Sequence, residues 1–342
     1  MGVQITDLLI RNVIKIDELT GKKLAVDAFN ILYQFLTTIR QRDGTPLMDS
    51  KGNITSHLTG LFSRTTRLME YDIKLCFVFD GKPPRLKETE SRKRKELKEE
   101  AKAKHKAAVE KKDVGEMKKY AARTAYLTEE MVDESKELIR ALGLPIVQAP
   151  SEGEAQAAAM VKKGDVWAIV SQDTDSLIFG ADRLVRNLSI SGRRKKASKL
   201  AYETVLPEIV DLKQNLQNLG ISQDQLIVLA ILVGTDYNPG GVKGLGPKKG
   251  LKLVKEYGSD FDRLFKSIEW DFPFEWTEVF DLIKKMPTTD EYELNWNEID
   301  RDKVLEILCD RHDFGRERIL KKLDDLQKER KKKQQKGLGE WF

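Results

Sequence analysis

Short apolar runs alternate with stretches of helical periodicity along the first half of the chain. Strands are predicted at residues 23–27 (KLAVD), 73–80 (IKLCFVFD), 145–149 (PIVQA) and 166–171 (VWAIVS). Helices are predicted at 28–40, 55–71, 128–142, 151–163 and, around the turn VKGLGPKKG, over 221–257. Strands that alternate with helices favour a parallel sheet covered on both faces. We therefore predict an α/β fold with a mostly parallel central sheet and helices on both faces.

Two segments depart from this alternation. Residues 85–112 contain twelve Lys or Arg and six Glu, with too few apolar positions to bury a helix face. Such a charge run is most often a solvated helix laced with ion pairs. From about residue 258 the chain has amphipathic patterns that predict mostly helices. The last residues, 331–342 (KKKQQKGLGEWF), have the pattern of a flexible tail.

The composition sets limits on the class of protein. The chain has 342 residues, of which 40% are hydrophobic and 34% charged, and its net charge of +5 does not by itself indicate a nucleic-acid partner. Its two cysteines, Cys76 and Cys309, have no CxxC neighbour, so neither a disulfide framework nor a zinc site is predicted. We see no signal peptide and no apolar run of the roughly 18 residues that a membrane helix needs. We expect an intracellular protein with no membrane partner.

Seven carboxylates stand at the ends of predicted elements: Asp27, Asp80, Glu152, Glu154, Asp173, Asp175 and Asp236. A single Asp at such a place is usually a helix cap or a turn former. However, ligands of an open parallel sheet bind beyond the carboxyl ends of its strands, where these acids should converge. Converging carboxylates repel one another without cations, and no Lys or Arg lies within two positions of Asp27, Asp173, Asp175 or Asp236.

Oxygen ligands of this kind favour magnesium or manganese over zinc. Magnesium keeps several water ligands, so one ion cannot use seven carboxylates, whereas two ions can. Two ions about 4 Å apart can stabilise both the attacking and the leaving oxygen of an in-line phosphoryl displacement. The sequence therefore predicts two divalent cations beside Asp173 and Asp175.

The order of several motifs resembles a known family. VDAFNILYQFL, TSHLTGLF, FVFDGKPPRLK, PSEGEAQAA, SQDTDSL and GTDYNPGGVKGLGPKK follow one another as in the structure-specific 5′ nucleases, and specifically the archaeal-type flap endonucleases. The match spans nearly the whole chain. It implies a PIN/5′ nuclease-like fold with a helical arch over the active site and a helix-hairpin-helix motif. It also implies that the seven acids hold two Mg²⁺ ions, for which Mn²⁺ can substitute. The start MGVQITDLL is similar to the family's N-terminus, whose glycine, here Gly2, lies near the active site.

The resemblance implies an activity and a division of the chain. The activity is that of a 5′ flap endonuclease with 5′→3′ exonuclease activity, acting on branched DNA in Okazaki fragment maturation and base excision repair. The division is a nuclease domain over 1–330 followed by a clamp-binding tail over 331–342. Within the domain we expect an N-terminal region at about 1–98, an arch at about 84–127, an internal region at about 116–258, the hairpin at about 222–257 and a helical part at 258–330.

The basic run and two further segments gain roles from this resemblance. Lys87 and Arg94 are seven residues apart, so on a helix they share one face, and the family brings these cations to the scissile phosphate. Tyr33 would otherwise be a core aromatic, whereas the family stacks a nucleobase on it. The segment TSHLTGLFSRTTR, with Thr55, Arg64 and Arg67, matches the region for the upstream duplex and its one-nucleotide 3′ flap.

The turn VKGLGPKKG resembles a helix-hairpin-helix turn. Its glycines let the backbone approach a phosphate, and the helix that begins near Pro247 points free N–H groups at it. The family also holds a K⁺ ion here, but this loop is one residue longer than in many relatives and has Gly241 where Ser is common. The other expected DNA contacts are Glu152, Gly234, Asp236, Lys243, Gly244, Gly246, Lys248 and Lys249.

The end of the chain matches a partner-binding motif. Gln335, Leu338, Trp341 and Phe342 have the spacing QxxLxxWF, which in the family plugs into the sliding clamp PCNA. Two adjacent aromatics on a polar tail are otherwise hard to explain, since nothing buries them. The chain stops at this motif, as archaeal members do, which implies a place in the cytoplasm or nucleoid; a eukaryotic protein would be nuclear.

Two alternatives remain beside a monomeric flap endonuclease. The first is another 5′ nuclease of the superfamily, such as a junction or bubble nuclease or a 5′ exonuclease. The segment of about 44 residues between Pro84 and Thr128 is too short for the large insertion of the bubble-cutting branch. The second is a non-catalytic DNA-junction binder, against which the seven acids argue because they would only repel phosphates.

Overall fold

The computed structural model describes residues 3–41, 43–87, 126–189, 192–195 and 202–339. In this part of the chain seven strands form a mixed sheet in the order β1-β9-β6-β5-β2-β3-β4. The strands are β1 (Asn12–Val13), β2 (Lys23–Asp27), β3 (Lys74–Phe79), β4 (Ile146–Gln148), β5 (Ala168–Val170), β6 (Arg183–Arg186) and β9 (Glu208–Asp211). The five strands from β6 to β4 are parallel, and β9 and β1 add an antiparallel edge. The predicted mostly parallel sheet is thus confirmed.

Alternate residues of the central strands pack into two hydrophobic cores, one on each face of the sheet. Leu24 and Val26 of β2 join the core on one face of the sheet, whereas Ala25 between them joins the core on the other. Strand β3 does the same with Phe77 and Cys76. Side chains alternate across a strand, so a strand that is apolar at every position is covered on both faces.

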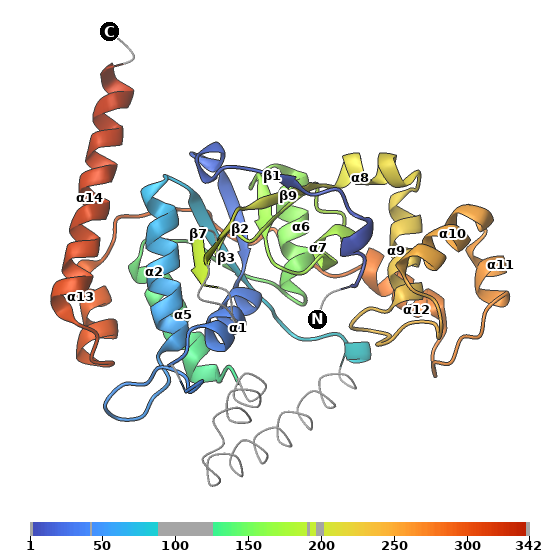
Figure 1. The fold of residues 1–342 in the computed structure, drawn as a ribbon, viewed down its shortest axis with the longest axis horizontal. Helices are drawn as coiled ribbons and strands as arrows, with labels where there is room; N and C mark the ends of the chain where they lie inside the picture. Colours follow the sequence, from blue (N-terminus) through green and yellow to red (C-terminus); the bar gives the residue numbers. More distant parts are fainter. Residues whose placement is uncertain (1–2, 42, 88–125, 190–191, 196–201, 340–342) are drawn as a thin grey trace.

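Helices cover both faces of the sheet (Figure 1). One layer contains α1 (Ala28–Thr38), α2 (Ser56–Glu70), α5 (Glu129–Ala141), α13 (Arg301–Leu305), the π-helical turn Glu306–Asp310 and α14 (Arg316–Gly339). The other contains α6 (Gly153–Lys163), α7 (Asp175–Ile178), α8 (Leu212–Leu219) and α9 (Gln223–Val233). Beyond α9 lie α10 (Pro247–Tyr257), α11 (Phe261–Lys266) and α12 (Trp276–Lys284). The short elements are the 3₁₀ turns Thr6–Leu8 and Ile16–Leu19 and the hairpin β7 (Gly192–Lys195) and β8 (Tyr202–Val205).

An extended segment interrupts the C-terminal region that we expected to be mostly helical. Residues 286–300 contain no helix or strand. They are held instead by tertiary hydrogen bonds, in which the Trp296 indole donates to the Leu75 carbonyl at 2.8 Å and the Asn297 N–H donates to the Gly143 carbonyl at 2.8 Å. The segment joins α12, on one layer, to α13, on the other.

The structure describes only part of the predicted arch and part of the predicted tail. The arch falls mostly on residues 88–125, which lie outside the described residues, as do Gly2, Trp341 and Phe342. The boundary expected at residue 330 falls inside α14, whose backbone is helical through Gly339. No single described helix is long and apolar enough to cross a membrane; the pair α8 and α9, bent by 79°, passes on length and composition only.

Candidate active site

The seven predicted acids lie at one edge of the sheet. Asp27 ends β2, Asp80 follows β3, Asp173 and Asp175 follow β5, Glu152 and Glu154 open α6 after β4, and Asp236 follows α9. Strands β2 to β5 pair in parallel, so their carboxyl ends meet at the same edge. The order of the strands brings together acids that are up to about 200 residues apart in the sequence.

Several of these acids sense the charges of others. Burial, followed by the charges of Asp80 and Asp173, raises the pKa of Asp27 to about 7. Burial, followed by the charges of Asp173 and Asp236, raises the pKa of Asp175 to about 7 as well. Burial and the neighbouring Asp175 and Asp27 raise the pKa of Glu154 well above its ordinary value. Burial is the largest cause of each shift, but the charges of the neighbouring acids contribute to all three, so these acids lie close together.

Backbone donors fix the orientation of three of these carboxylates. The Gly153 N–H donates to Asp80 Oδ1 at 2.7 Å, and the Val3 N–H donates to Asp175 Oδ1 at 2.5 Å. A Cβ at Gly153 would lie 2.7 Å from Asp80 Oδ1, so only glycine allows this approach. The Asn30 N–H donates to Asp27 Oδ1 at 3.0 Å, which caps α1. Asp27 is therefore both a helix cap and a member of the acid cluster.

Glu154 has an oxygen without a partner. Its Oε1 is buried and accepts no hydrogen bond from the described residues. Buried polar atoms are usually satisfied, and a lone buried carboxylate oxygen costs free energy. An orphaned acceptor inside an acid cluster is the kind of atom that a cation compensates.

Lys87 is the cation that meets the acids. Its Nζ lies 2.7 Å from Glu152 Oε2 and 3.5 Å from Asp236 Oδ2. Burial lowers the pKa of Lys87, but the charges of Glu152, Asp236 and Asp80 outweigh burial and hold that pKa above its usual value. The base of the basic run therefore sits at the site. Its predicted companion, Arg94, lies outside the described residues.

The donor set suits hard divalent cations. It consists of oxygen atoms only, several of them buried, and it contains the unpartnered Glu154 Oε1. Among the described residues, no group of three or more His, Cys, Asp and Glu side chains is arranged as it stands to hold a metal ion. Part of the reason is visible, since Lys87 and the N–H groups of Gly153 and Val3 engage oxygens of Glu152, Asp80 and Asp175.

The predicted hairpin lies between α9 and α10. Gly234 has φ +112° and Gly241 has φ +60°, and a Cβ at Gly241 would lie 2.4 Å from the Leu232 carbonyl oxygen. The backbone thus excludes any side chain at position 241. Gly244 and Gly246 have open space around them, and the side chains of Lys243, Lys248 and Lys249 are exposed. A phosphate can approach this turn.

Asn238 ties the hairpin to the acid cluster, and sequence reasoning missed it. Its Oδ1 accepts from Thr235 Oγ1 at 2.7 Å and its Nδ2 donates to the Ile231 carbonyl at 2.7 Å. These bonds fix the loop that carries Asp236 against the end of α9. The only available sequence signal was a polar Asn directly after the GTDY motif.

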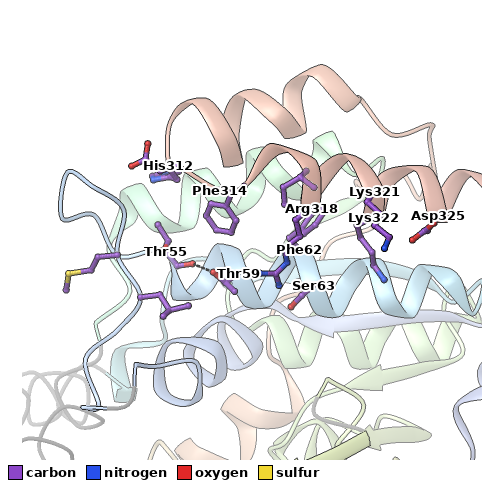
Figure 2. A pocket seen from close by; sticks show the side chains of 15 residues that line it. Thr55, Thr59, Phe62, Ser63, His312, Phe314, Arg318, Lys321, Lys322 and Asp325 are labelled. Atoms are coloured by element: carbon purple, nitrogen blue, oxygen red, sulfur yellow. Dashed lines mark hydrogen bonds between the residues drawn. The ribbon is translucent and has the colours of Figure 1, made fainter.

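Thr55 lines a cavity of about 560 Å³ between α2 and α14. Figure 2 shows Thr59 and Ser63 on α2 and, from the chain 250 residues later, Phe314 and Arg318 on the opposite wall. The sequence motifs predicted a binding region on α2 but gave no indication of the opposite wall, which contains Phe314 and Arg318. Two other predicted DNA contacts lie on helices in this layer: Tyr33 is half-buried on α1 and packs against the core, and Arg64 is half-buried on α2.

His312 lines one end of this cavity and contacts two acids. His312 Nδ1 lies 3.0 Å from Asp49 Oδ2, and His312 Nε2 lies 2.9 Å from Glu134 Oε1. His57 lies beneath them, fully buried, and neither ring nitrogen has a hydrogen bond to the described residues. Nothing in the sequence indicated that these two histidines lie close together.

The clamp motif is described only in part. Gln335 and Leu338 belong to the helical backbone of α14, whereas Trp341 and Phe342 lie outside the described residues.

Comparison with known proteins gives full-length matches. The family model "XPG N-terminal domain" matches residues 1–101, and "XPG I-region" matches residues 143–236. Flap endonuclease 1 of Pyrococcus abyssi is 51% identical over 100% of this chain and 98% of its own length. Flap endonuclease 1 of Thermococcus onnurineus is 50% identical over 100% and 99%. The solved structure of flap endonuclease-1 from Methanococcus jannaschii has a TM-score of 0.76 at 45% identity, and the match covers 97% of this chain and 100% of that one.

Proposed function

The chain belongs to the flap endonuclease 1 group of the XPG nuclease family, and on that premise we propose that it cleaves 5′ flaps of branched DNA by metal-dependent phosphodiester hydrolysis, with an associated 5′→3′ exonuclease activity. One observation carries the proposal: seven acids from separate elements gather at one edge of the sheet, where Lys87 contacts two of them. A non-catalytic junction binder would have no use for such a concentration of negative charge against phosphate.

The acids would hold two Mg²⁺ ions, or Mn²⁺ in their place. Bound there, the ions would supply the nucleophile by lowering the pKa of water and would neutralise charge on the phosphate. The protein's own contribution is to fix the carboxylates through backbone donors before DNA arrives. Glu152 and Asp236 would be shared between Lys87 and such ions, and the Lys87 ammonium would then be able to contact the phosphate.

Lys87 and, on the same predicted helix face, Arg94 would then stabilise the charge that develops on the scissile phosphate. Lys87 begins the segment that the family uses as an arch around the single-stranded flap. The half-buried Tyr33 would stack on the nucleobase beside the scissile bond.

Duplex DNA would be held at two places on either side of these acids. At the hairpin, Gly244 and Gly246 let a phosphate approach the start of α10, and Lys243, Lys248 and Lys249 add charge. Gly234 and the backbone carbonyls of this turn would also bind K⁺, whereas Gly241 contributes no side chain. The cavity between α2 and α14 would take the one-nucleotide 3′ flap. Thr55 lines this cavity, and Arg64 would contact the upstream duplex.

The wider role would be Okazaki fragment maturation and base excision repair by a monomeric enzyme. The motif Gln335, Leu338, Trp341 and Phe342 would tether it to the sliding clamp PCNA, and the tail begins within α14 near residue 331. Its relatives in Pyrococcus and Thermococcus are archaeal-type enzymes, so we propose an intracellular place in the cytoplasm or nucleoid.

The test is cleavage of a labelled double-flap substrate with and without Mg²⁺. We expect one cut at the junction between the 5′ flap and the duplex, only when the ion is present. A four-way junction assayed in parallel separates the rival nuclease, which would cut it symmetrically. Binding of the double flap without any cleavage in Mg²⁺ or Mn²⁺ would leave only the junction binder.

A further inference from the structure

Asn30 links the acid at the end of β2 to the acid after β5. Asn30 lies in the first turn of α1, and its Nδ2 donates to Asp173 Oδ2 at 2.8 Å. Its Oδ1 accepts from the Gln172 N–H at 3.2 Å. A backbone N–H can only donate and a carboxylate can only accept, so the two contacts fix which amide atom is which.

Ser171 makes a second link between the same two acids. Its hydroxyl donates to Asp27 Oδ2 at 3.3 Å, and the Asp173 N–H donates to the Ser171 oxygen at 3.2 Å. With the Asn30 N–H on Asp27 Oδ1, both oxygens of Asp27 are engaged. We call these five residues, Asp27, Asn30, Ser171, Gln172 and Asp173, the Asn30 clasp.

The clasp opposes a repulsion that the site cannot avoid. Asp27 ends β2 and Asp173 follows the neighbouring strand β5, and the charge of Asp173 disfavours the charged form of Asp27. Asp173 lies in the short loop between β5 and α7, with no regular element of its own to hold it. A Lys at position 30 would hold Asp173 by neutralising it and would compete with a cation. A neutral amide holds it and leaves the negative charge available.

We propose that Asn30 is a positioning residue, which holds Asp173 through Oδ2 in the orientation in which this carboxylate serves as a ligand to a divalent cation. This role rests on the proposed function, in which the acids hold such cations. Hydrogen-bonding partners behind a metal ligand typically change metal affinity by about ten- to a hundredfold when they are removed. Asn30 is half-buried and its amide contacts Asp173 and the Gln172 N–H, so we expect its effect to pass through Asp173.

The test is Mn²⁺ binding to the DNA-free, full-length protein, followed by the electron paramagnetic resonance signal of free Mn²⁺. Asn30→Ala and Asn30→Leu remove the amide, and Leu preserves its bulk and the helix. We expect the Mn²⁺ dissociation constant to rise about tenfold in both variants. We also expect flap cleavage to return toward the wild-type rate when Mn²⁺ is raised by the same factor, which a merely structural defect would not show.

Gln34→Ala is the matched control. Gln34 lies one turn further along α1, and its amide oxygen accepts from Ser189 Oγ at 2.5 Å rather than from the acid cluster. We expect this variant to bind Mn²⁺ as the wild type does. Wild-type affinity in both Asn30 variants, or an equal loss in Gln34→Ala, overturns the role of Asn30. A wild-type protein that binds no Mn²⁺ overturns the proposed metal site itself, and the role of Asn30 with it.

Discussion

Lys87 Nζ lies 2.7 Å from Glu152 Oε2, although 65 residues separate the two in the chain. In the absence of other cations this lysine partly neutralises an acid cluster that would otherwise repel itself. The same atom is well placed to meet a phosphate once the acids have other partners. The contact therefore links the basic run to the chemistry of the site.

Lys87→Ala is expected to reduce the rate of cleavage but to change DNA affinity little. Loss of one preorganised charge on a reacting phosphate costs about a hundred- to a thousandfold in rate. Single-turnover cleavage and flap-DNA binding in Ca²⁺ measure the two quantities separately. The same variant should bind Mn²⁺ more tightly without DNA, because Glu152 loses its internal competitor. Lys163→Ala, which removes an exposed pair with Asp290, is the control, and equal losses of rate and affinity in Lys87→Ala would contradict a catalytic role.

Glu154→Gln should separate stability from activity. The variant replaces a buried carboxyl, whose charged form is disfavoured by burial and by the neighbouring acids, with a neutral amide of similar shape, so the metal-free protein should be about as stable as the wild type. Cleavage should fall by at least about a hundredfold, since a cation ligand is lost. Thermal unfolding with and without Mn²⁺ measures both effects, with the exposed Glu291→Gln as control. Clear destabilisation of the metal-free variant would show that Glu154 is structural.

Thr59→Phe should fill the cavity between α2 and α14. If the cavity takes the 3′ nucleotide, the variant should cleave a double flap no better than a substrate without a 3′ flap. A loss of about tenfold on the double flap corresponds to about 1.4 kcal/mol of binding. The substrate without a 3′ flap is the internal control. An undiminished preference for the double flap would place the 3′ nucleotide elsewhere.

His57 should make the fold sensitive to acid. Burial, followed by the charge of His312, lowers the pKa of His57 from 6.5 to about 3. Between these two values the unfolded chain binds a proton that the folded protein does not, so the free energy of unfolding decreases as the pH falls. At pH 5 the effect is about 2 kcal/mol. The stability of His57→Leu relative to the wild type should therefore be greater at pH 5 than at pH 8 by about that amount. Urea unfolding of both proteins at the two pH values measures this change. The same difference at both pH values would mean that folding does not lower the pKa of His57.

Removal of residues 335–342 should leave cleavage of a flap unchanged and abolish its stimulation by the sliding clamp. The deleted residues include the aromatic pair Trp341 and Phe342, and 335–339 form the end of α14, whereas earlier α14 residues from Arg318 to Asp325 line the cavity. Cleavage rates with and without the clamp, on the same substrate, test both halves of the prediction. Undiminished stimulation would assign clamp binding to another surface.

The sequence alone determined the four central strands that lead to the acids and which acids follow them. KLAVD and IKLCFVF each contain one lysine and are otherwise apolar up to Asp27 and Asp80, so the strand, its covered faces and its acidic end follow from local patterning. Motif order then indicated the family, and the comparisons agree with it. These features could be predicted from the sequence because each depends on residues that lie close together in the chain.

Tertiary structure decided which side chains meet. The contact of Lys87 with Glu152, the bridge from Asn30 to Asp173 and the second wall of the cavity at Phe314 join residues that no periodicity connects. Each depends on the order of the strands and on α14 packing against α2. A side chain's partner is fixed by the sum of many distant contacts, whereas its tendency to form a helix or strand is fixed by the residues beside it.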